Sequence, residues 1–584
     1  MESGRVNNEQ IPGITPAEVG EIPAPRPRRR TPFEMMPLTT VLPCAAAGAT
    51  AATSAIALDA PLWAVAGTGV GVCALGAARW GKTNVWRILA LRTALWWRNR
   101  GNRAAPERTE PFDVPVPDTG GDRCGMRWDG SQLITMLALD RTAVAPTRLD
   151  ADDIHSNATV AMSDVARCLA QFDIRLAAID VVTLGVRTSG PHNVVEVYQK
   201  LLGPLPAAAD RTVWLVLRFD PLDNTVAIAH RGGGEAGMIR TALVAARRVA
   251  SRLTTRGVRV ALLSAAELAA AEASMSHDTD PAQWTEDWRL LRGNGIELAG
   301  YAIPATALDS DVLSAVWALP GKSVLTRLRL TAQTVSNTPG ERGAEVAMTA
   351  LVRQDTSGAT DSSIEAAATA LGLLPLRGAQ RRILLDGGHL DPATALSGPP
   401  GALARFTVPI GGCGQVIGAT VDGAGVAVPL FGPAVRRAEI VGSLWLAQLM
   451  VLRAVAVGAM VVVHSVRSGA WEKLVDEVGA PAKLSIASTG GSHRTAVATM
   501  IVYDGVASAG HISDATAVYV RDPEQVQAAG PDVDVALIES ADTPGEVVLR
   551  TAAGSLAVRL VSITEEHSYL GRTTTEAPVP VATA

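Results

Sequence analysis

Cysteine is scarce in this sequence, and its spacing gives no recognisable site. Only five cysteines occur in 584 residues, at positions 44, 73, 124, 168 and 413. An odd number of widely separated cysteines provides neither a disulfide framework nor the close pairs that bind zinc. We therefore expect a reducing compartment and no metal site.

The chain also lacks an excess of basic residues. Its 52 Lys and Arg residues against 57 Asp and Glu residues give a formal net charge of −5. Such a balance gives no strongly basic surface suited to binding nucleic acid, so we expect no nucleic-acid partner.

Mean hydropathy is +0.20, which is high for a soluble protein and low for one that crosses a membrane many times. One apolar insert in a mostly soluble chain fits this value.

Sequence patterns of known catalytic sites are absent or badly placed. Neither His-Glu-x-x-His nor Gly-x-Ser-x-Gly occurs. Residues 76–83 match the phosphate-loop pattern Gly-x-x-x-x-Gly-Lys-Thr, but a long apolar run precedes them instead of a sheet strand. Acidic pairs at positions 278/280, 309/311 and 532/534 are more typical of loop caps than of a metal site. We predict no catalytic residue, no cofactor and no metal.

Long uncharged runs are confined to the N-terminal part of the chain. Between Glu34 and Asp59 lie 24 uncharged residues, and 19 more lie between Asp59 and Arg79. Each run is near the ~20 residues that a helix needs to cross a bilayer. We predict a two-helix transmembrane hairpin over residues 34–80, in which small residues such as Gly67 and Gly71 allow close helix packing. The alternative is a buried hairpin in a soluble protein.

Basic residues flank this hairpin on both sides. Four arginines lie between residues 26 and 30, and six Lys and Arg residues lie between 79 and 100. The positive-inside rule therefore predicts that both flanks are cytoplasmic. The second flank is also rich in tryptophan and is expected to lie on anionic inner-leaflet lipid as a helix, unless it docks on the protein's own domain. The residues expected at this lipid interface are Arg79, Trp80, Lys82, Trp86, Arg92, Trp96 and Trp97.

The remainder of the chain predicts a membrane-anchored α/β protein, with α+β as the alternative, in several units. Strands and helices alternate from residue 112 onward, which favours layers around a sheet. A polar stretch over residues 354–361 suggests a boundary between two units. The expected segments are a disordered basic tail (1–33), the hairpin (34–80), a basic Trp-rich juxtamembrane helix and linker (81–111), a first cytoplasmic α/β domain (112–355), a second mixed α/β domain (356–570) and a disordered tail (571–584).

Within these units the hydrophobic periodicity predicts individual elements. Expected strands are 132–139, 175–187, 212–218, 258–263, 406–417, 425–430 and 460–464. Expected helices are 161–172, 194–202, 235–252 and 437–457. The glycine-rich segment 412–418 is interpreted as a turn among strands and not as a dinucleotide loop, because a hairpin turn at Asp422-Gly423 follows it.

The order of these parts, together with two local motifs, resembles the EccE family of type VII (ESX) secretion systems. The first motif, Cys124-Gly125-Met126-Arg127-Trp128-Asp129-Gly130, precedes the strand at 133–137. The second begins at Gly411-Gly412-Cys413-Gly414-Gln415 and continues to Pro433. The similarity extends over about residues 35–565 and is to the longer members of the family.

The resemblance implies a structural subunit that joins EccB, EccC and EccD in an inner-membrane complex and supports its stability. It implies no catalytic residues, since ATP hydrolysis in that complex belongs to EccC. Two alternatives remain open. One is a membrane-tethered nucleotide- or sugar-nucleotide-dependent enzyme that uses an acidic pair, and the other is a lipid-binding regulator that acts through the basic Trp-rich segment.

Overall fold

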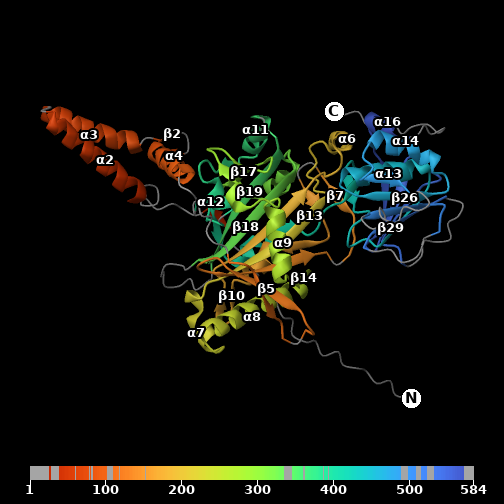
Figure 1. Ribbon diagram of the computed structural model, residues 1–584, viewed down its shortest axis with the longest axis horizontal. Coiled ribbons are helices and arrows are strands. Elements are labelled where there is room, and N and C mark those ends of the chain that lie inside the picture. Colours follow the sequence, from red (N-terminus) through yellow and green to blue (C-terminus); the bar gives the residue numbers. More distant parts are fainter. Residues whose placement is uncertain are drawn as a thin grey trace, which may run out of the picture.

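The structure is a computed structural model, and its described residues form an elongated molecule with a helical arm and two sheet-based units (Figure 1). The described residues are 25–27, 38–58, 61–77, 79–80, 83–100, 109–117, 119–141, 143–150, 153–333, 345–358, 362–385, 387–391, 394–487, 498–507, 514–522 and 532–570. The expected disordered tail 571–584 lies outside them, as do residues 1–24. Within the expected N-terminal tail, Arg26 and Pro27 form the short strand β1.

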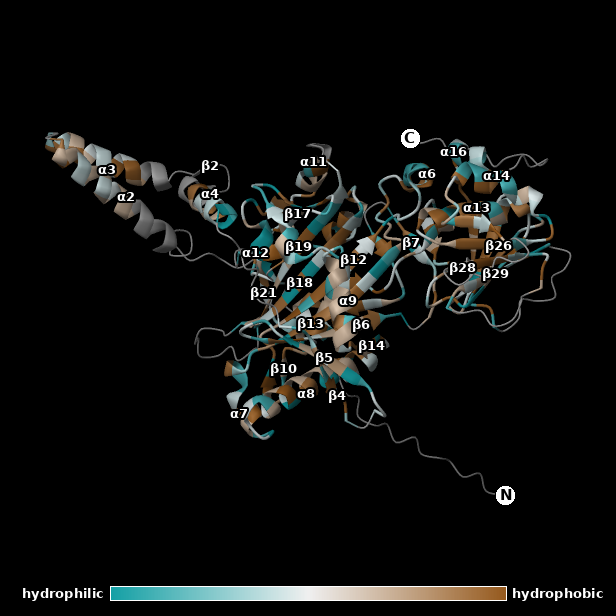
Figure 2. Ribbon diagram, in the orientation of Figure 1, coloured by the Kyte–Doolittle hydropathy of each residue, from teal (hydrophilic) through white to brown (hydrophobic). Residues whose placement is uncertain are grey.

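Two helices, α2 (Leu38–Ala57) and α3 (Leu62–Ala77), pack against each other and project away from the rest of the chain (Figure 1). Their sequences contain no charged residue, and Figure 2 colours α3 mainly white to brown. The expected helical hairpin is therefore present, and we call α2 and α3 together the arm.

The expectation that both helices cross a membrane is not confirmed. Within the described residues, no helix combines the length and the apolarity that crossing a bilayer requires. Helix α3 has 16 residues, which at 1.5 Å per residue gives about 24 Å, less than the ~30 Å of a hydrocarbon core. Alanine, glycine and threonine, which are only weakly apolar or polar, make up much of α2.

The first unit is built on a sheet whose strands run antiparallel along its main path, β15-β16-β17-β19-β18-β12-β13-β6-β5-β4. Short strands β1, β14, β20 and β21 pair beside this path. The strands are β4 (Phe112–Pro115), β5 (Arg123–Trp128), β6 (Leu133–Asp140), β12 (Ala178–Val186), β13 (Asp210–Phe219), β14 (Arg259–Leu262), β15 (Thr285–Glu286), β16 (Leu291–Gly293), β17 (Ile296–Ile303), β18 (Ser323–Gln333), β19 (Glu345–Ser357), β20 (Leu374–Pro375) and β21 (Leu396–Gly398).

The two faces of this sheet carry different side chains because successive strand residues point to opposite faces. Leu215 and Leu217 of β13 and Leu328 of β18 belong to the main core, to which helix α8 (Gly234–Thr254) also contributes. The opposite face carries a smaller cluster, including Val182 and Val216, under helix α9 (Ala265–Met275). Other helices of this unit are α5 (Met162–Ala166), α6 (His192–Leu202), α7 (Thr225–Ala229), α10 (Ser310–Ala315), α11 (Ser362–Ala370) and α12 (Gln380–Leu384).

The second unit contains a mixed sheet in the order β27-β26-β28-β29-β25-β30-β31-β32-β23-β24-β7-β8. The strands from β27 to β30 pair in parallel and the rest are antiparallel. The strands are β7 (Thr147–Leu149), β8 (Ile154–His155), β23 (Gln415–Ala419), β24 (Gly425–Val428), β25 (Arg437–Val441), β26 (Val461–Ser465), β27 (Leu484–Ile486), β28 (Met500–Asp504), β29 (Thr516–Arg521), β30 (Val535–Glu539), β31 (Glu546–Thr551) and β32 (Gly554–Leu560). Its helices are α13 (Leu444–Ala456), α14 (Gly469–Val478) and α16 (Thr564–Tyr569).

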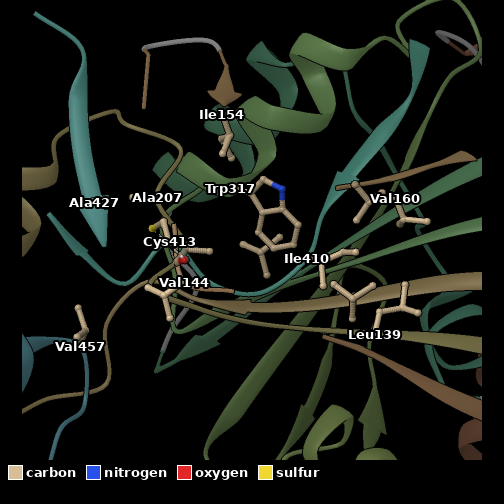
Figure 3. Close-up of a cluster of buried hydrophobic side chains, with 14 of the residues drawn as sticks. Leu139, Val144, Ile154, Val160, Ala207, Trp317, Ile410, Cys413, Ala427 and Val457 are labelled. Atoms are coloured by element: carbon tan, nitrogen blue, oxygen red, sulfur yellow. Dashed lines mark hydrogen bonds between the residues drawn. The ribbon is translucent and has the colours of Figure 1, made fainter. Parts of the chain in front are cut away.

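A continuous core joins the two units. Figure 3 shows buried side chains from both, with Trp317 among Cys413, Val144 and Ile410. The backbone N–H of Val416 donates to the Tyr198 hydroxyl at 2.8 Å, which ties β23 to α6. The two units are therefore packed together through apolar side chains and buried hydrogen bonds.

The mixed α/β class with large sheets is confirmed, and several elements differ locally. The expected helix 161–172 is only α5, followed by the β10 (Ala170–Gln171) and β11 (Ile174–Arg175) hairpin, with Phe172 at φ 55° in the turn. The expected helix 437–457 begins with the strand β25, and Ser443 caps the helix that follows. The boundary expected near residue 355 falls inside β19, and β21 also belongs to the first sheet.

Candidate functional site

A pocket with a volume of about 140 Å³ lies on the α9 face of the first sheet. Strand alternation brings its lining together, because Asp180 pairs with Arg329 across β12 and β18, and Val182 pairs with Arg327. Glu272 and Met275 of α9 close one side, and the segment after α12 closes another. The polar lining is Arg127, Asp180, Arg218, Glu272, Ser276, Arg327 and Arg353, and the apolar lining includes Ile134, Met136, Val182, Val216, Leu325 and Leu351.

Asp180 is the central anion of this face. It is 1% exposed and accepts hydrogen bonds from Arg329 at 2.5 and 2.7 Å and from Arg218 at 3.1 Å. Burial alone would raise the pKa of Asp180, but the guanidinium groups of Arg329 and Arg218 more than offset burial and hold this pKa well below its ordinary value. Asp180 is therefore ionised throughout the neutral range.

Two further ion pairs border the pocket. Arg127 contacts Glu272 at 2.7 Å. Arg353 binds Asp355 through two hydrogen bonds of 2.7 Å, and Asp355 also contacts His277 and Ser323, each at 2.8 Å. Burial alone would raise the pKa of Asp355, but Arg353 and His277 lower it by more than that. The pKa of Asp355 is therefore below its ordinary value. The carboxylates of Glu272 and Asp355 are therefore already bound by cationic side chains of the protein.

Arg327 differs from the other arginines of the pocket. Its Nη2 donates to the carbonyl oxygens of Ile383 at 3.0 Å and Gly388 at 3.3 Å, and among the described residues it forms no ion pair. Burial, followed by the neighbouring Arg329, lowers the pKa of Arg327 to about 9. The guanidinium is still protonated at neutral pH and is only partly compensated.

Sequence reasoning missed this pocket, although it did select Arg127 within a motif. The available signal is the charged residue inside an apolar strand, as in Leu325-Thr326-Arg327-Leu328-Arg329-Leu330. Because side chains on a strand alternate between its two faces, Arg327 and Arg329 share a face with Leu325 and not with the core residue Leu328. Which charges on neighbouring strands meet them depends on strand order, which one sequence does not reveal.

The Trp-rich segment forms helix α4 (Val85–Arg100), which docks on the first unit by one face. Arg98 contacts Glu286 at 3.2 Å and donates to the carbonyl of Gly378 at 2.8 Å, while Arg92 lies over the Trp288 ring at 5.2 Å. Trp97 on another face is 70% exposed and Trp96 is 49% exposed. The helix therefore docks on its own domain and still presents tryptophans to the surroundings.

The other residues expected at the lipid interface are described only in part. Lys82 lies outside the described residues, and the side chains of Arg79, Trp80 and Trp86 do as well. Arg79 and Trp80 form β2 (Arg79–Trp80), which pairs with β3 (Thr83–Asn84). The element before the phosphate-loop pattern is helix α3, so no sheet strand leads into it.

Small residues bring the two arm helices together at Gly48 and Gly69. A Cβ on Gly69 would lie 3.3 Å from the Gly48 carbonyl oxygen, and one on Gly48 would meet the Cys73 sulfur. Gly67 and Gly71 have nothing within 4 Å of such a Cβ. Their expected packing role stays a prediction.

The first motif supports a turn and the pocket wall. The Asp129 side chain accepts from the backbone N–H groups of Ser131 at 3.0 Å and Gln132 at 2.7 Å, and its second oxygen lies 3.5 Å from Arg218. Gly130 has φ 99°, a conformation that favours glycine. The carbonyl of Trp128 accepts from Thr109.

The second motif packs a connecting loop between the units. The Cys413 thiol donates to the carbonyl of Ala208 at 3.1 Å, and Arg141 donates to the carbonyl of Gly412. A Cβ on Gly412 would meet the Ala209 carbonyl oxygen, and Gly414, with φ 75°, lies against Pro429. Gly411 has φ 78° and lies against Arg141. These residues serve close backbone packing.

Buried thiols and the acidic pairs do not form a reactive site in the described structure. Burial raises the pKa of Cys413 and Cys168 to about 11 and that of Cys124 to about 12, so these thiols are poor nucleophiles at neutral pH. Asp309 caps α10, Asp280 caps a 3-10 turn, and Asp534 accepts from the backbone of residues 436 and 437. Within the described residues, no group of three or more His, Cys, Asp or Glu could hold a metal.

Comparison with known proteins identifies the class. Residues 207–303 match the family described as "Putative type VII ESX secretion system translocon, EccE". This range begins just before β13, ends with β17 and includes α8 and α9. The two motifs on which the resemblance was based, Arg127–Gly130 and Gly411–Gly414, lie outside it.

Individual relatives are ESX secretion proteins of mycobacteria. ESX-2 secretion system protein EccE2 of Mycobacterium tuberculosis is 30% identical over 277 residues, which cover 47% of this chain and 48% of that protein. ESX-1 secretion system protein EccE1 of the same species is 29% identical over 370 residues, 63% of this chain and 70% of that protein. ESX-5 secretion system protein EccE5 of Mycobacterium marinum is 29% identical over 212 residues, 34% of this chain and 50% of that protein.

The aligned region thus spans about half the length of the ESX-2 relative and more of the ESX-1 relative. The chain contains an EccE domain and is a homologue of EccE proteins, so the resemblance to this family is confirmed. The relatives that it matches are named as type VII (ESX) secretion system proteins.

Proposed function

We propose that this chain is a structural subunit of the inner-membrane core complex of a type VII secretion system, where it supports assembly and stability. The observation that carries the proposal is the uncharged arm, which projects from a folded body that contains the EccE domain (Figure 1). An extended apolar element beside a large soluble body is suited to attachment at a membrane or to other membrane subunits.

Exposed apolar side chains support an attachment role for the arm. Leu58, Leu62 and Trp63, at the turn between α2 and α3, are 81, 85 and 79% exposed. Isolated surface apolar residues are common, but large ones gathered at the end of one element mark an interaction site.

The polar side chains that the structure describes in the arm are satisfied within their own helices. The hydroxyls of Thr50, Ser54 and Thr68 donate to carbonyl oxygens four residues earlier, at 2.6 to 2.8 Å. This is the arrangement that polar groups need in an apolar environment. It supports insertion of the arm into lipid or between apolar helices of partners.

The basic residues on both sides of the arm favour a cytoplasmic position for the body and for both termini. In that orientation Trp96 and Trp97 of α4 would meet anionic inner-leaflet lipid, and Arg92 would support α4 from the domain side. The partners proposed on the family resemblance are EccB, EccC and EccD.

A nucleotide- or sugar-nucleotide-dependent enzyme is not favoured. The acidic pairs that it would use cap separate segments and do not converge on the pocket. The names of the relatives describe secretion-system proteins.

Purification of the tagged chain from membranes in mild neutral detergent tests the proposal. We expect EccB, EccC and EccD to co-purify with the unmodified chain, and the variant Leu62→Asp/Trp63→Asp to lose them by about tenfold or more, because charges at the arm end oppose burial in an apolar surface. Val421→Asp is the matched control, since Val421 is also an exposed apolar residue, at 94%, but lies in the β23–β24 turn. Recovery of the unmodified chain alone, or equal loss in both variants, contradicts the proposal.

A further inference from the structure

The pocket on the α9 face of the first sheet combines several guanidinium groups with an apolar floor. Among the described residues, five guanidinium groups and four carboxylates lie in or beside it. The guanidinium groups are those of Arg127, Arg218, Arg327, Arg329 and Arg353, and the carboxylates are those of Asp129, Asp180, Glu272 and Asp355. Two histidines also adjoin the network, His277 at Asp355 and His389 at Arg329.

Of these five arginines, Arg327 is the one that forms no ion pair with a described residue. The other four arginines each contact a carboxylate, at 2.5 to 3.5 Å. Arg327 has the two carbonyl oxygens of Ile383 and Gly388, which carry only partial charge. Asp180, which already binds Arg329 and Arg218, offsets the charge of Arg327 only in part. A largely buried cation that forms no ion pair with a described residue is unfavourable, and an anion beside it would reduce that cost.

The apolar part of the lining restricts what kind of anion fits. Met136, Val216, Leu325, Leu351 and Leu384 line the pocket beside the arginines. A fully hydrated inorganic ion gains nothing from these side chains, whereas an apolar group attached to the anion would bury surface against them. Guanidinium groups are well suited to phosphate and carboxylate oxygens, which they can bind in a bidentate manner.

We propose that this pocket binds an organic anion, a phosphate ester or carboxylate on an apolar body, with Arg327 as the residue that contacts the anionic group. The site is independent of membrane attachment, because it lies on the sheet of the first unit and none of the described arm residues lines it. It would give the secretion subunit a means of sensing a small metabolite or a lipid-derived anion.

Binding to the full-length chain in neutral maltoside detergent tests the site, with octyl phosphate, octanoate and inorganic phosphate as probes and calorimetry as the measurement. We expect octyl phosphate or octanoate to bind at least about tenfold more tightly than inorganic phosphate, because only the first two bury an apolar chain. Tighter binding of octyl phosphate assigns the site to phosphate esters, and tighter or equal binding of octanoate assigns it to carboxylates.

The variant Arg327→Gln is expected to weaken binding of the preferred probe about tenfold or more, because it removes a charge-assisted contact. Arg240→Gln is the matched control, since Arg240 is an exposed arginine of α8 whose guanidinium donates to the carbonyl of Arg231. Without ligand, Arg327→Gln should have a melting temperature at least as high as the unmodified chain, because a buried cation that is only partly compensated has been removed.

Several outcomes would overturn the proposal. They are absence of binding by the unmodified chain, equal binding by Arg327→Gln, and loss of binding by Arg240→Gln as well. If Arg327→Gln does not fold, Met275→Glu replaces it, because a carboxylate from α9 at the pocket wall must also repel the anion. Unchanged binding by folded Met275→Glu would contradict the proposed position of the ligand.

Discussion

Replacing Glu566 with alanine is expected to lower the free energy of unfolding of the second unit by about 3–5 kcal/mol, the usual cost of leaving a buried charge without its partner. Glu566 is 1% exposed and accepts from Nε and Nη2 of Arg453 at 2.8 and 2.9 Å. Arg453 is fully buried on α13 and also donates to the carbonyls of Val416 and Ile417 at 3.0 Å. This ion pair therefore connects the C-terminal helix α16 with α13 and β23.

The neighbouring residue provides the control for this prediction. Glu565 is half exposed and lies 3.6 Å from Lys200, so Glu565→Ala should change stability little. The double variant Arg453→Met/Glu566→Ala should recover part of the loss, because no charge is then buried alone. Chemical denaturation followed by circular dichroism measures all three, and equal stability of the two single variants would refute the assigned role of the pair.

Replacing Asp180 with asparagine is expected to destabilise the first unit by about 3–5 kcal/mol at neutral pH. The change preserves shape but leaves the buried Arg329 and its neighbour Arg218 without their shared anion. Asp173→Asn is the matched control, because Asp173 also binds an arginine, Arg231 at 2.7 Å, but lies at the surface. Denaturation at pH 7 should show near-normal stability for the control.

The pH dependence of this effect has a defined sign. The pKa of Asp180 is lower in the folded chain than its ordinary value of about 3.9, so the folded state holds the proton less tightly than the unfolded state. The stabilisation is therefore complete above about pH 5 and decreases as pH falls below the ordinary pKa towards the folded one. The difference between the unmodified chain and Asp180→Asn should shrink on acidification from pH 5 to pH 3. A difference that grows over this range would contradict the assignment.

Much of the fold could be predicted from the sequence because many elements have strong periodicity. The strand expected at 132–139 is β6 and the helix expected at 235–252 lies within α8. The prediction of one helix over residues 437–457 was wrong because a buried parallel strand and a buried helix are both continuously apolar. Only the cap at Ser443 separates the strand from the helix here. Strand order, and the entry of β7 and β8 into the second sheet, depend on long-range pairing that local patterns do not encode.

The candidate sites also differ in how far the sequence alone predicts them. The arm could be predicted because absence of charge is a local property, whereas its contact at Gly48 and Gly69 depends on how two helices rotate against each other. The pocket could not be predicted, since Asp180, Arg327 and Glu272 come from distant segments that meet only on one face of the sheet. The motifs at Arg127–Gly130 and Gly411–Gly414 contribute to turns and close packing.

Secretion by the bacterium that encodes this chain tests the central claim most directly. In a strain that lacks the chain, the amount of type VII substrate in the culture medium would be measured after complementation with the unmodified chain, with Leu62→Asp/Trp63→Asp or with Val421→Asp. We predict that the unmodified chain and Val421→Asp restore secretion, and that the arm variant does not although its body is present and folded. Normal secretion in the strain without the chain, or full restoration by the arm variant, would contradict the account.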